Sequence, residues 1–368
     1  MRNGDYFYRQ TVGFLYRQTV RLFCHWDGIF RRRLCACLVI IIPHFSFLIP
    51  HSNAQTLSFV ELNCENLFDY SHDIGKDDAE YMPDAIRHWN RKRYWRKLNN
   101  IGQELLSCSS EGIPDLIALC EVENDSVLRD LTRRSLLRNA RYEYVMTSSP
   151  DLRGIDVALL YQPYSFAPIR SYSLRVTPVE GMRPTRDILY VAGLVRSFSE
   201  SDDSSRSQAV QNDTLHIFVV HAPSRFGGER YSRPFRLAVA DRLCVSVDSI
   251  RMLSPEARII VAGDFNDAAD SPALQQLYRH GLHCISHDAR GQNGARGTYR
   301  YRGEWGSIDH ILVSPPLQHR VDTVFIHAPS FLLEEEKVYG GFRPRRTYNG
   351  YRYQPGYSDH LPLVVKFN

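Results

Sequence analysis

The sequence lacks paired cysteines. Of its eight cysteines, five follow residue 54, at positions 64, 108, 120, 244 and 284. None of these five belongs to a Cys-x-x-Cys pair, which argues against a zinc site of that type. Because their number is odd, they cannot form a fully paired disulfide framework, although a single disulfide between two of them stays an alternative. Cys64 and Cys120 lie in apolar, strand-like runs, which favours buried thiols.

The sequence also lacks an excess of basic residues over most of its length. Its 368 residues carry a formal net charge of +4, from 45 Lys and Arg against 41 Asp and Glu. Residues 1–54 hold seven of the basic residues and two of the acidic ones, so residues 55–368 carry 38 against 39 and are nearly neutral. The overall charge therefore does not indicate a class of partner.

A long unbroken apolar run is absent as well. Leu34–Pro50 is apolar but is interrupted by a proline, a histidine and a serine, and it is slightly short for a membrane-spanning helix. Arg31–Arg33 precede it, and the small-x-small triplet Ser52–Ala54 follows it. This pattern predicts a signal peptide over residues 1–54, cleaved after Ala54, with a membrane anchor as the less favoured alternative. We therefore expect an exported protein, periplasmic or secreted, without stable membrane insertion once the leader is removed.

No segment after residue 54 has the shift in composition on both sides that marks a linker, so we predict one domain over residues 55–368. Strand-like apolar runs alternate with helix-like segments at 87–106, 126–138 and 233–253. Several of the strands are apolar throughout, which predicts a layered α/β core. The polar segment 199–212 is typical of a loop between two strands.

Polar residues able to bind a metal or a phosphate stand at the ends of nearly all predicted strands. They are Asn63, Glu65, Glu121, Glu123, His221, Asp264, Asn266, Asp309, His310, Ser358, Asp359 and His360. Each taken alone is explained by a turn or a solvated strand end. Loops at strand ends can converge while the sheet fixes their spacing, so the whole set predicts one site.

Seven motifs carry a family resemblance. They are LNCENLFD (62–69), LCEVEN (119–124), RGIDVALLY (153–161), HAPSRFGG (221–228), GDFND (263–267), SIDHILVS (307–314) and SDHLP (358–362). In this order the chain resembles the endonuclease/exonuclease/phosphatase superfamily of deoxyribonuclease-like, metal-dependent phosphodiesterases. The resemblance implies a four-layer α/β/β/α sandwich with two packed mixed β-sheets, and it implies hydrolysis of phosphodiesters with a divalent cation.

The resemblance also implies metal ligands. Glu121 matches the family's metal-binding glutamate, and its hard carboxylate suits Mg²⁺ or Mn²⁺, with Ca²⁺ as an alternative. Asn63 and Glu65 are expected to complete or orient the metal shell, and Asp359 is expected to be a further ligand. Glu123 would be the substitute for Glu121.

The catalytic residues follow from the same motifs. We expect Asp264 to orient or deprotonate the attacking water and Asn266 to hold that water or the phosphate, since strand alternation puts both on one side and Phe265 on the other. His360 resembles the histidine that hydrogen-bonds the scissile phosphate, with Asp309 fixing its tautomer. His221 matches the second active-site histidine of the deoxyribonuclease and sphingomyelinase branches.

Four further residues near these motifs are expected to have lesser roles. Arg225 and Arg186 are candidates for phosphate binding, with surface ion pairs as the alternative. Asp267 is expected to be a turn or cap residue. His310 points away from Asp309 on an ideal strand and is expected to be structural.

The expected substrate is nucleic acid, cleaved by a monomeric endonuclease acting on DNA or RNA. Residues 342–357 interleave Arg with Tyr as nucleic-acid grooves do, whereas residues 87–97 are better explained as an amphipathic helix with a solvated face. A phospholipid or sphingomyelin phosphodiesterase is one alternative, but 331–333 (FLL) runs straight into Glu334–Glu336, a poor membrane wedge. An inositol-phosphate or nucleotide phosphatase and a catalytically inactive binding protein are the others.

Overall fold

The computed structural model describes residues 56–110, 112–196 and 214–368, all within one compact unit that spans Ala54–Asn368. The predicted signal peptide and the predicted loop at 199–212 lie outside the described residues. The domain boundary after residue 54 stays a prediction.

The unit is built on two six-stranded mixed sheets, each with one parallel pair of strands at its centre. The first sheet has the order β13-β18-β1-β2-β4-β3. Its strands are β1 (Leu57–Leu67), β2 (Leu116–Val122), β3 (Glu143–Met146), β4 (Asp156–Tyr161), β13 (Val321–Ile326) and β18 (Leu363–Phe367). The second sheet has the order β5-β6-β7-β8-β12-β9. Its strands are β5 (Phe166–Leu174), β6 (Ile188–Val195), β7 (Thr214–His221), β8 (Arg258–Asp264), β9 (His283–Cys284) and β12 (Asp309–Val313).

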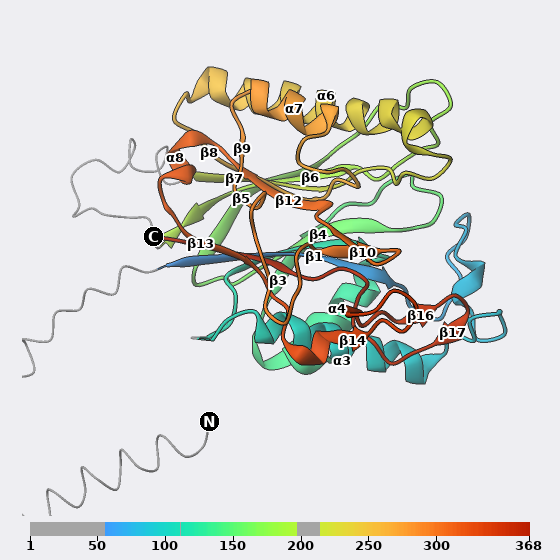
Figure 1. The fold of residues 1–368 in the computed structure, drawn as a ribbon. Coiled ribbons are helices and arrows are strands. Elements are labelled where there is room, and N and C mark those ends of the chain that lie inside the picture. Colours follow the sequence, from blue (N-terminus) through green and yellow to red (C-terminus); the bar gives the residue numbers. More distant parts are fainter. Residues whose placement is uncertain (1–55, 111, 197–213) are drawn as a thin grey trace, which may run out of the picture. The chain divides into compact units, whose positions relative to one another are not determined.

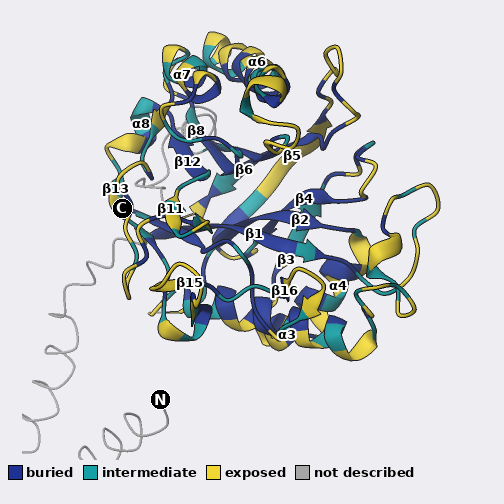
Figure 2. Cartoon of the chain, turned by 45° about the vertical axis from the view of Figure 1, so that its right-hand side comes forward, coloured by how far each residue is buried: buried dark blue, intermediate teal, exposed yellow. Residues whose placement is uncertain are grey.

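Helices cover the outer face of each sheet (Figure 1). α6 (Glu229–Leu253) and α7 (Pro272–Arg279) pack on the second sheet, and α3 (Arg91–Ser107) and α4 (Asp125–Arg133) pack on the first. The inner faces of the two sheets meet in a third apolar layer. Figure 2 shows β1, β2 and β8 buried, whereas the edge strand β5 is largely exposed. The predicted four-layer α/β/β/α sandwich is confirmed.

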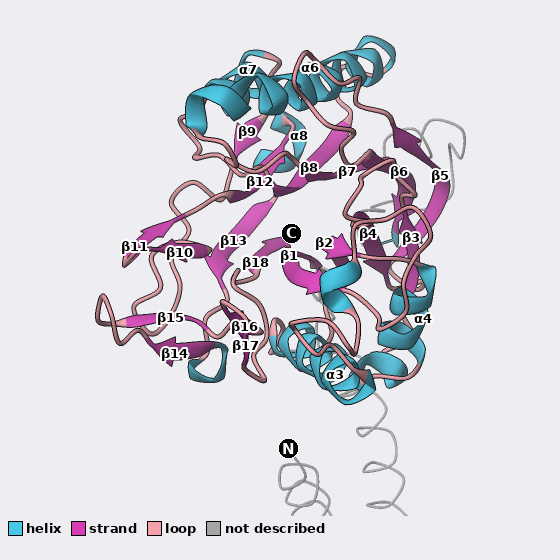
Figure 3. Cartoon of the chain, turned by 90° about the vertical axis from the view of Figure 1, so that its right-hand side faces the viewer, coloured by secondary structure: helices cyan, strands magenta, loops and turns pink. Residues whose placement is uncertain are grey.

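Short elements complete the chain. They are the 3₁₀ helices η2 (Ala79–Tyr81), η3 (Leu136–Asn139) and η5 (Ser330–Leu332), the helix α8 (Pro315–Gln318), and the paired strands β10 (Tyr299–Tyr301) with β11 (Glu304–Gly306), β14 (Leu333–Glu335) with β15 (Phe342–Pro344), and β16 (Tyr348–Asn349) with β17 (Arg352–Tyr353). Figure 3 shows these strand pairs grouped on one side.

The helix α3 differs from the amphipathic helix expected over 87–97. Asn90 caps it by accepting from the Lys92 and Arg93 amides, so the helix begins only at Arg91. Its inner face carries polar residues: Lys97 is buried and donates to Thr347 Oγ1 over 2.7 Å, and it also contacts the Tyr357 carbonyl. This side of the helix therefore holds the loop that leads to the SDHLP motif instead of facing water.

Two further features of the described residues concern the cysteines and the helices. The five cysteines there are all free, and Cys64 and Cys120 are buried. Among the helices of residues 56–110, 112–196 and 214–368, none combines the length and the apolarity needed to cross a membrane.

Candidate active site

The two parallel strand pairs bring the motif residues to the same ends of the sheets. In the first sheet Asn63 of β1 is paired with Cys120 of β2, next to Glu121. In the second sheet His221, the last residue of β7, is paired with Asp264, the last residue of β8. Parallel neighbours end at the same edge, so the side chains that follow them gather in one place.

Glu121 is aimed by an irregularity in its strand. The β2–β4 register shifts between Cys120 and Val122, and Glu121 takes a left-handed backbone with φ of +61°. Such a conformation costs about 1–3 kcal/mol in a residue with a side chain and persists where the surroundings enforce it. Here the Glu121 carboxylate accepts from the Asn66 amide over 2.7 Å and lies 3.7 Å from Arg153 Nη1.

The GDFND motif ends its strand earlier than we expected. β8 stops at Asp264, and Asn266 has φ of +52°, so the predicted strand alternation does not extend through Asn266. Instead the Asn266 amide donates to Asp264 Oδ1 over 2.8 Å, and its Nδ2 donates to the Ala222 carbonyl over 3.1 Å. Phe265 is buried in the apolar layer under α6 and α7, opposite the site, as predicted.

Asn63, Glu121, His221 and Asp264 form the centre of the site. Asn63 Nδ2 donates to Asp264 Oδ2 over 3.0 Å, and His221 Nε2 lies 3.6 Å from the same oxygen and 3.8 Å from Glu121 Oε1. Burial and the nearby Asp309 charge raise the pKa of Asp264 to about 7. Burial holds the pKa of His221 well below its usual range, so this ring is neutral.

His360 and Asp309 form a second pair beside this centre. His360 Nδ1 donates to Asp309 Oδ2 over 2.8 Å and to Oδ1 over 3.0 Å, and both side chains are buried. Burial lowers the pKa of His360, but the charge and hydrogen bond of Asp309, together with the charges of Asp359 and Asp264, outweigh burial and hold the pKa well above its usual range. His360 is therefore a cation at neutral pH, which the Asp309 carboxylate stabilises.

The donors fit a divalent cation. Carboxylate oxygens of Asp264 and Asp309 and a ring nitrogen of His360 lie within 4.8 Å of one another, but the protonated His360 ring has no lone pair for a metal, so the ligand atoms here are the carboxylate oxygens. Glu121 adds a second hard carboxylate at the Asp264 side. Carboxylate oxygens concentrated in a buried site suit Mg²⁺ or Mn²⁺.

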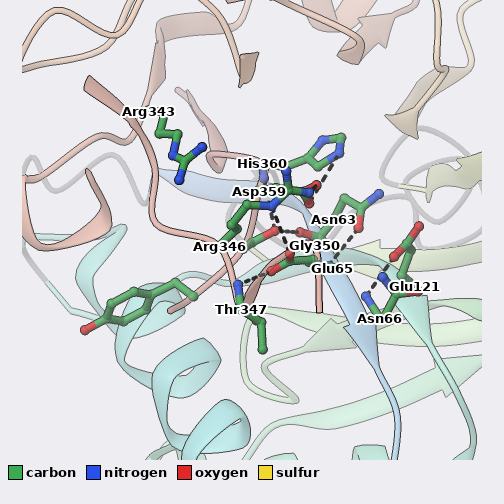
Figure 4. Close-up of polar contacts among 12 residues, drawn as sticks. Asn63, Glu65, Asn66, Glu121, Arg343, Arg346, Thr347, Gly350, Asp359 and His360 are labelled. Atoms are coloured by element: carbon green, nitrogen blue, oxygen red, sulfur yellow. Dashed lines mark hydrogen bonds and ion pairs between the residues drawn. The ribbon is translucent and has the colours of Figure 1, made fainter. Parts of the chain in front are cut away.

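Two of the predicted metal ligands are engaged elsewhere (Figure 4). Glu65 accepts from the Thr347 amide over 2.6 Å and lies 3.4 Å from Arg346 Nε and 3.6 Å from Lys97 Nζ. Asp359 is ion-paired with Arg346 Nη2 at 2.5 Å. The structure therefore brings Asn63 and Glu121 to the catalytic centre, whereas Arg346 holds Glu65 and Asp359.

The two predicted phosphate-binding arginines also have partners. Arg225 donates to the Asn266 carbonyl over 2.9 Å and to Asp267 Oδ1 over 3.1 Å. Arg186 is buried and donates to the Ala222 carbonyl over 2.8 Å, and its charge contributes to the low pKa of His221. Both arginines support the site's loops through these contacts.

Three remaining motif residues have structural partners, as expected for His310, whereas Asp267 was expected to be a turn or cap residue and Glu123 to be a substitute for Glu121. Asp267 is buried and forms an ion pair with Arg236 Nε of α6 at 2.8 Å. His310 Nε2 donates to the Asp267 carbonyl over 2.9 Å. Glu123 accepts from the Asp69 amide over 2.6 Å, away from the centre.

The sequence prediction gave no role to Glu61 or Arg153, and it included Arg346 only as part of the expected nucleic-acid segment 342–357. Glu61 is fully buried in β1, and neither of its carboxyl oxygens has a hydrogen-bond partner among the described residues. Burial, with the charges of Asp309 and Asp264, raises its pKa well above the usual range. The glutamate inside the apolar run LSFVELNC was the sequence signal that could have predicted a carboxyl group behind the site. Arg153 belongs to the motif RGIDVALLY (153–161), but no neighbouring residue indicated that its side chain lies beside that of Glu121.

Comparison with known proteins agrees with this geometry. A profile of the endonuclease/exonuclease/phosphatase family matches residues 58–368. The chain belongs to this family, whose members hydrolyse phosphoesters. A search of curated proteins gave no match.

Solved structures share the fold at low sequence identity. An endonuclease/exonuclease/phosphatase family protein from Bacteroides thetaiotaomicron is 15% identical with a TM-score of 0.52, covering 85% of this chain and 98% of its own. A mannosyl-6-phosphatase from the same organism is 16% identical with a TM-score of 0.51, covering 84% and 98%. The human Nocturnin catalytic domain with bound sulfate is 17% identical with a TM-score of 0.50, covering 85% and 93%. At these identities the likeness establishes the fold alone.

Proposed function

We propose that the protein hydrolyses phosphoesters with the help of a divalent cation. One observation carries this proposal: a buried aspartate with a pKa near 7, Asp264, lies in hydrogen-bond contact with Asn63 and beside a neutral histidine, and a protonated histidine–aspartate pair adjoins it. A base and an acid of this kind are what attack by water on a phosphoester requires.

Each side chain then has a role. Asp264 orients the attacking water and accepts its proton, and Asn63 keeps the Asp264 carboxylate in place. His360, protonated through Asp309, donates to a phosphate oxygen. His221 donates a hydrogen bond from a neutral ring, without adding charge. Glu121 and Asn63 would hold the cation, which when bound would offset the negative charge of the phosphate.

A hydrolysis panel tests the reaction. Wild-type protein, Asp264→Ala and the exposed control Asp288→Ala would be assayed on plasmid DNA, RNA, sphingomyelin, inositol phosphates and p-nitrophenyl phosphate, with Mg²⁺ or Mn²⁺ and with a chelator. We expect Asp264→Ala to lower kcat at least about 100-fold, in the range for removal of a general base, and the chelator to abolish turnover. The absence of turnover in every wild-type condition would favour a binding protein. Turnover that Asp264→Ala leaves intact would overturn the residue assignment.

A nuclease remains the first specific candidate, on the strength of the loop after His221. Phe226 in this loop is 86% exposed, and an exposed aromatic ring suits a stacked base. The neighbouring Arg225 is ion-paired with Asp267 and Glu229, so the support comes from Phe226. We expect Phe226→Ala to raise the KM for single-stranded DNA several-fold. Unchanged DNA kinetics would remove this support.

The other expected nucleic-acid segment supports the nuclease less. Within 342–357, Arg343 is ion-paired with Glu334 and Glu336, and Arg346 with Glu65 and Asp359. Its cations are thus engaged within the protein. The phospholipid alternative also lacks a wedge, since Leu332 and Leu333 are buried.

We further propose that the protein is exported and acts as a monomer. The leader pattern in residues 1–54 supports export. N-terminal sequencing of the protein from the periplasm or medium should show a start after Ala54, and sedimentation should give the monomer mass. An intact leader on cytoplasmic protein would contradict the proposal of export.

A further inference from the structure

A cavity of about 460 Å³ lies on the outer face of the second sheet, away from the catalytic centre. Strands β5, β6 and β7 form its floor, and the second half of α6, from Arg242 to Leu253, forms its wall. On β7 the cavity is lined by His216 near the start of the strand, whereas the catalytic His221 is the last residue. Five residues of extended strand span roughly 16 Å, so this cavity is separate from the active site.

Aromatic rings from three neighbouring strands form the floor of the cavity. Tyr172 of β5 is paired with Tyr190 of β6, which is paired with Phe218 of β7, so the three side chains share one face of the sheet. The ring centres of Tyr172 and Tyr190 lie 4.7 Å apart, and those of Tyr190 and Phe218 lie 5.0 Å apart. Tyr172 is 46% exposed at the sheet edge, so part of its ring is open to a ligand. This floor suits a flat apolar ring.

Two arginines at the cavity lack an acidic partner. Arg170 of β5 and Arg242 of α6 form no ion pair within residues 56–110, 112–196 and 214–368, and Arg242 Nη1 donates only to Ser246 Oγ, over 3.3 Å. The acidic residues of this part of α6 face elsewhere: Asp241 binds Gln276, and Asp248 lies 2.7 Å from His280 Nδ1. A guanidinium group pairs readily with a carboxylate or a phosphate, so the cavity favours an anion.

His216 adds a neutral donor beside these charges. Its Nδ1 lies 2.8 Å from the Tyr190 hydroxyl, and burial lowers the pKa of the ring to about 4. When the hydroxyl donates to Nδ1, the single proton of the neutral ring is at Nε2, which has no partner in the described part of the chain. The volume of the cavity falls within the roughly 300–1,000 Å³ of small-molecule sites.

We propose that this cavity binds a small aromatic anion, a flat ring that carries a carboxylate or a phosphate. The ring would lie against Tyr172, and the anionic group would pair with Arg170 and Arg242. The site is additional to the proposed hydrolysis and does not depend on it, so a failure of either proposal leaves the other standing.

Calorimetry with four probes tests the ligand class. Benzoate and phenylphosphonate are aromatic anions, benzamide is a neutral aromatic, and inorganic phosphate is an anion without a ring. Phenylphosphonate has a P–C bond in place of the ester bond, so ester hydrolysis cannot consume it. In the presence of a chelator, one of the two aromatic anions should bind at least tenfold more tightly than benzamide and phosphate. The tighter of the two distinguishes a carboxylate from a phosphate ligand.

Variants assign this binding to the cavity. Arg242→Gln and Tyr172→Ala should each weaken it about tenfold, which is the size expected for one charged hydrogen bond. Arg129→Gln is the matched control, because Arg129 of α4 also donates to a serine of its own helix, at Ser126 Oγ over 3.2 Å, but lies at the other sheet. Asp264→Ala should bind the anion as wild type does, because the catalytic centre is not involved.

Four outcomes would overturn the assignment. They are no binding of either aromatic anion at millimolar concentration, equal affinity for benzamide, binding that Asp264→Ala abolishes, and binding that neither Arg242→Gln nor Tyr172→Ala alters. If Arg242→Gln does not fold, Arg170→Gln on the exposed edge strand replaces it, with the same expected loss of affinity.

Discussion

Glu104 shows how a single buried group can make stability depend on pH. It lies in α3, is fully buried, and neither of its carboxyl oxygens has a hydrogen-bond partner within the described part of the chain. Burial raises its pKa from 4.5 to about 8, partly offset by the charge of Lys97. The folded state thus holds a proton that the unfolded chain releases above about 4.5. The associated stability is complete below that pH and is lost as the pH rises through about 8.

We expect Glu104→Gln to remove this dependence. Relative to wild type, the variant should gain more stability at pH 8 than at pH 5, by up to a few kcal/mol, since one pKa unit corresponds to about 1.4 kcal/mol. Urea unfolding at the two pH values measures the difference, with the exposed Glu256→Gln as control. Equal gains at both pH values would show that Glu104 is ionised in the folded protein.

Asp309→Asn tests the charge that keeps His360 protonated. With the carboxylate replaced by an amide, the charge of Asp309 no longer opposes the effect of burial, and the pKa of His360 should fall. The alkaline limb of the kcat/KM profile should then move to lower pH, and activity at neutral pH should drop about 100-fold or more. Asp187→Asn, at a buried aspartate paired with Arg175, is the matched control. An unshifted alkaline limb would show that His360 is not the group whose protonation limits activity at high pH.

At the residue scale, the sequence was sufficient to predict where a side chain lies when its position along a strand determines that location. Asn63, His221 and Asp264 were expected to converge because each stands at the end of a predicted strand, and they do converge. Glu65 differs because its orientation depends on Arg346, which is 281 residues away in sequence. The backbone of Glu121 could not be anticipated either, because a shift of register is a property of the paired strands.

At the scale of elements, the contact between β7 and β8 depends on Gly263. Its φ is +144°, and an added Cβ would lie 1.9 Å from the Val220 carbonyl oxygen. We expect Gly263→Ala to cost about 3 kcal/mol or more, from backbone strain and from forcing the two strands apart. Because His221 and Asp264 end these strands, the remaining folded protein should also lose activity.

Urea unfolding and the hydrolysis assay would measure both effects of Gly263→Ala. Gly306→Ala is the control, since an added Cβ there meets no atom within 4 Å. A Gly263→Ala protein as stable as wild type would mean that β7 and β8 can separate without cost.

The helix α3 shows what sequence pattern leaves open at this scale. Apolar spacing predicted the helix, but not that Lys97, Asn100 and Glu104 on its inner face would be buried. These positions recur at helical spacing, so they form a polar stripe beside the apolar one. Its partner is the loop before SDHLP, which Asn100 Nδ2 contacts at the Pro355 carbonyl over 3.2 Å. No pattern within the helix sequence indicates a partner so distant along the chain.

At the scale of the whole molecule, alternating apolar strands and helices with motifs at strand ends were enough to predict two packed sheets and one site. The short strand pairs β14–β15 and β16–β17 were not predicted, because each strand is only two or three residues long. Of these pairs, β16–β17 contributes Tyr348 and Gly350 to the lining of a small cavity beside Glu65 and Asp359, together with the segment around Arg87. The sandwich thus positions the groups of the catalytic centre, while its irregular loops determine which residues lie beside that centre.

Binding of a cation should stabilise the whole unit. Glu61, Glu121, Asp264 and Asp309 concentrate carboxyl groups between the sheets, and mutual repulsion contributes to the raised pKa values of Glu61 and Asp264. A cation bound there would relieve this repulsion only in the folded state. We expect Mg²⁺ or Mn²⁺ to raise Tm, by the equivalent of about 2.7 kcal/mol at a concentration 100 times Kd, and a chelator to reverse the shift.

Variants assign this stabilisation to the site. Glu121→Gln should weaken the Tm response to the cation while leaving the cation-free protein folded, because the amide keeps an acceptor for the Asn66 amide. The exposed Glu256→Gln should respond as wild type does. A cation-induced rise in Tm of equal size in Glu121→Gln would place the cation away from Glu121. No rise in the wild type with either metal at millimolar concentration would argue that the folded chain binds neither ion tightly without substrate.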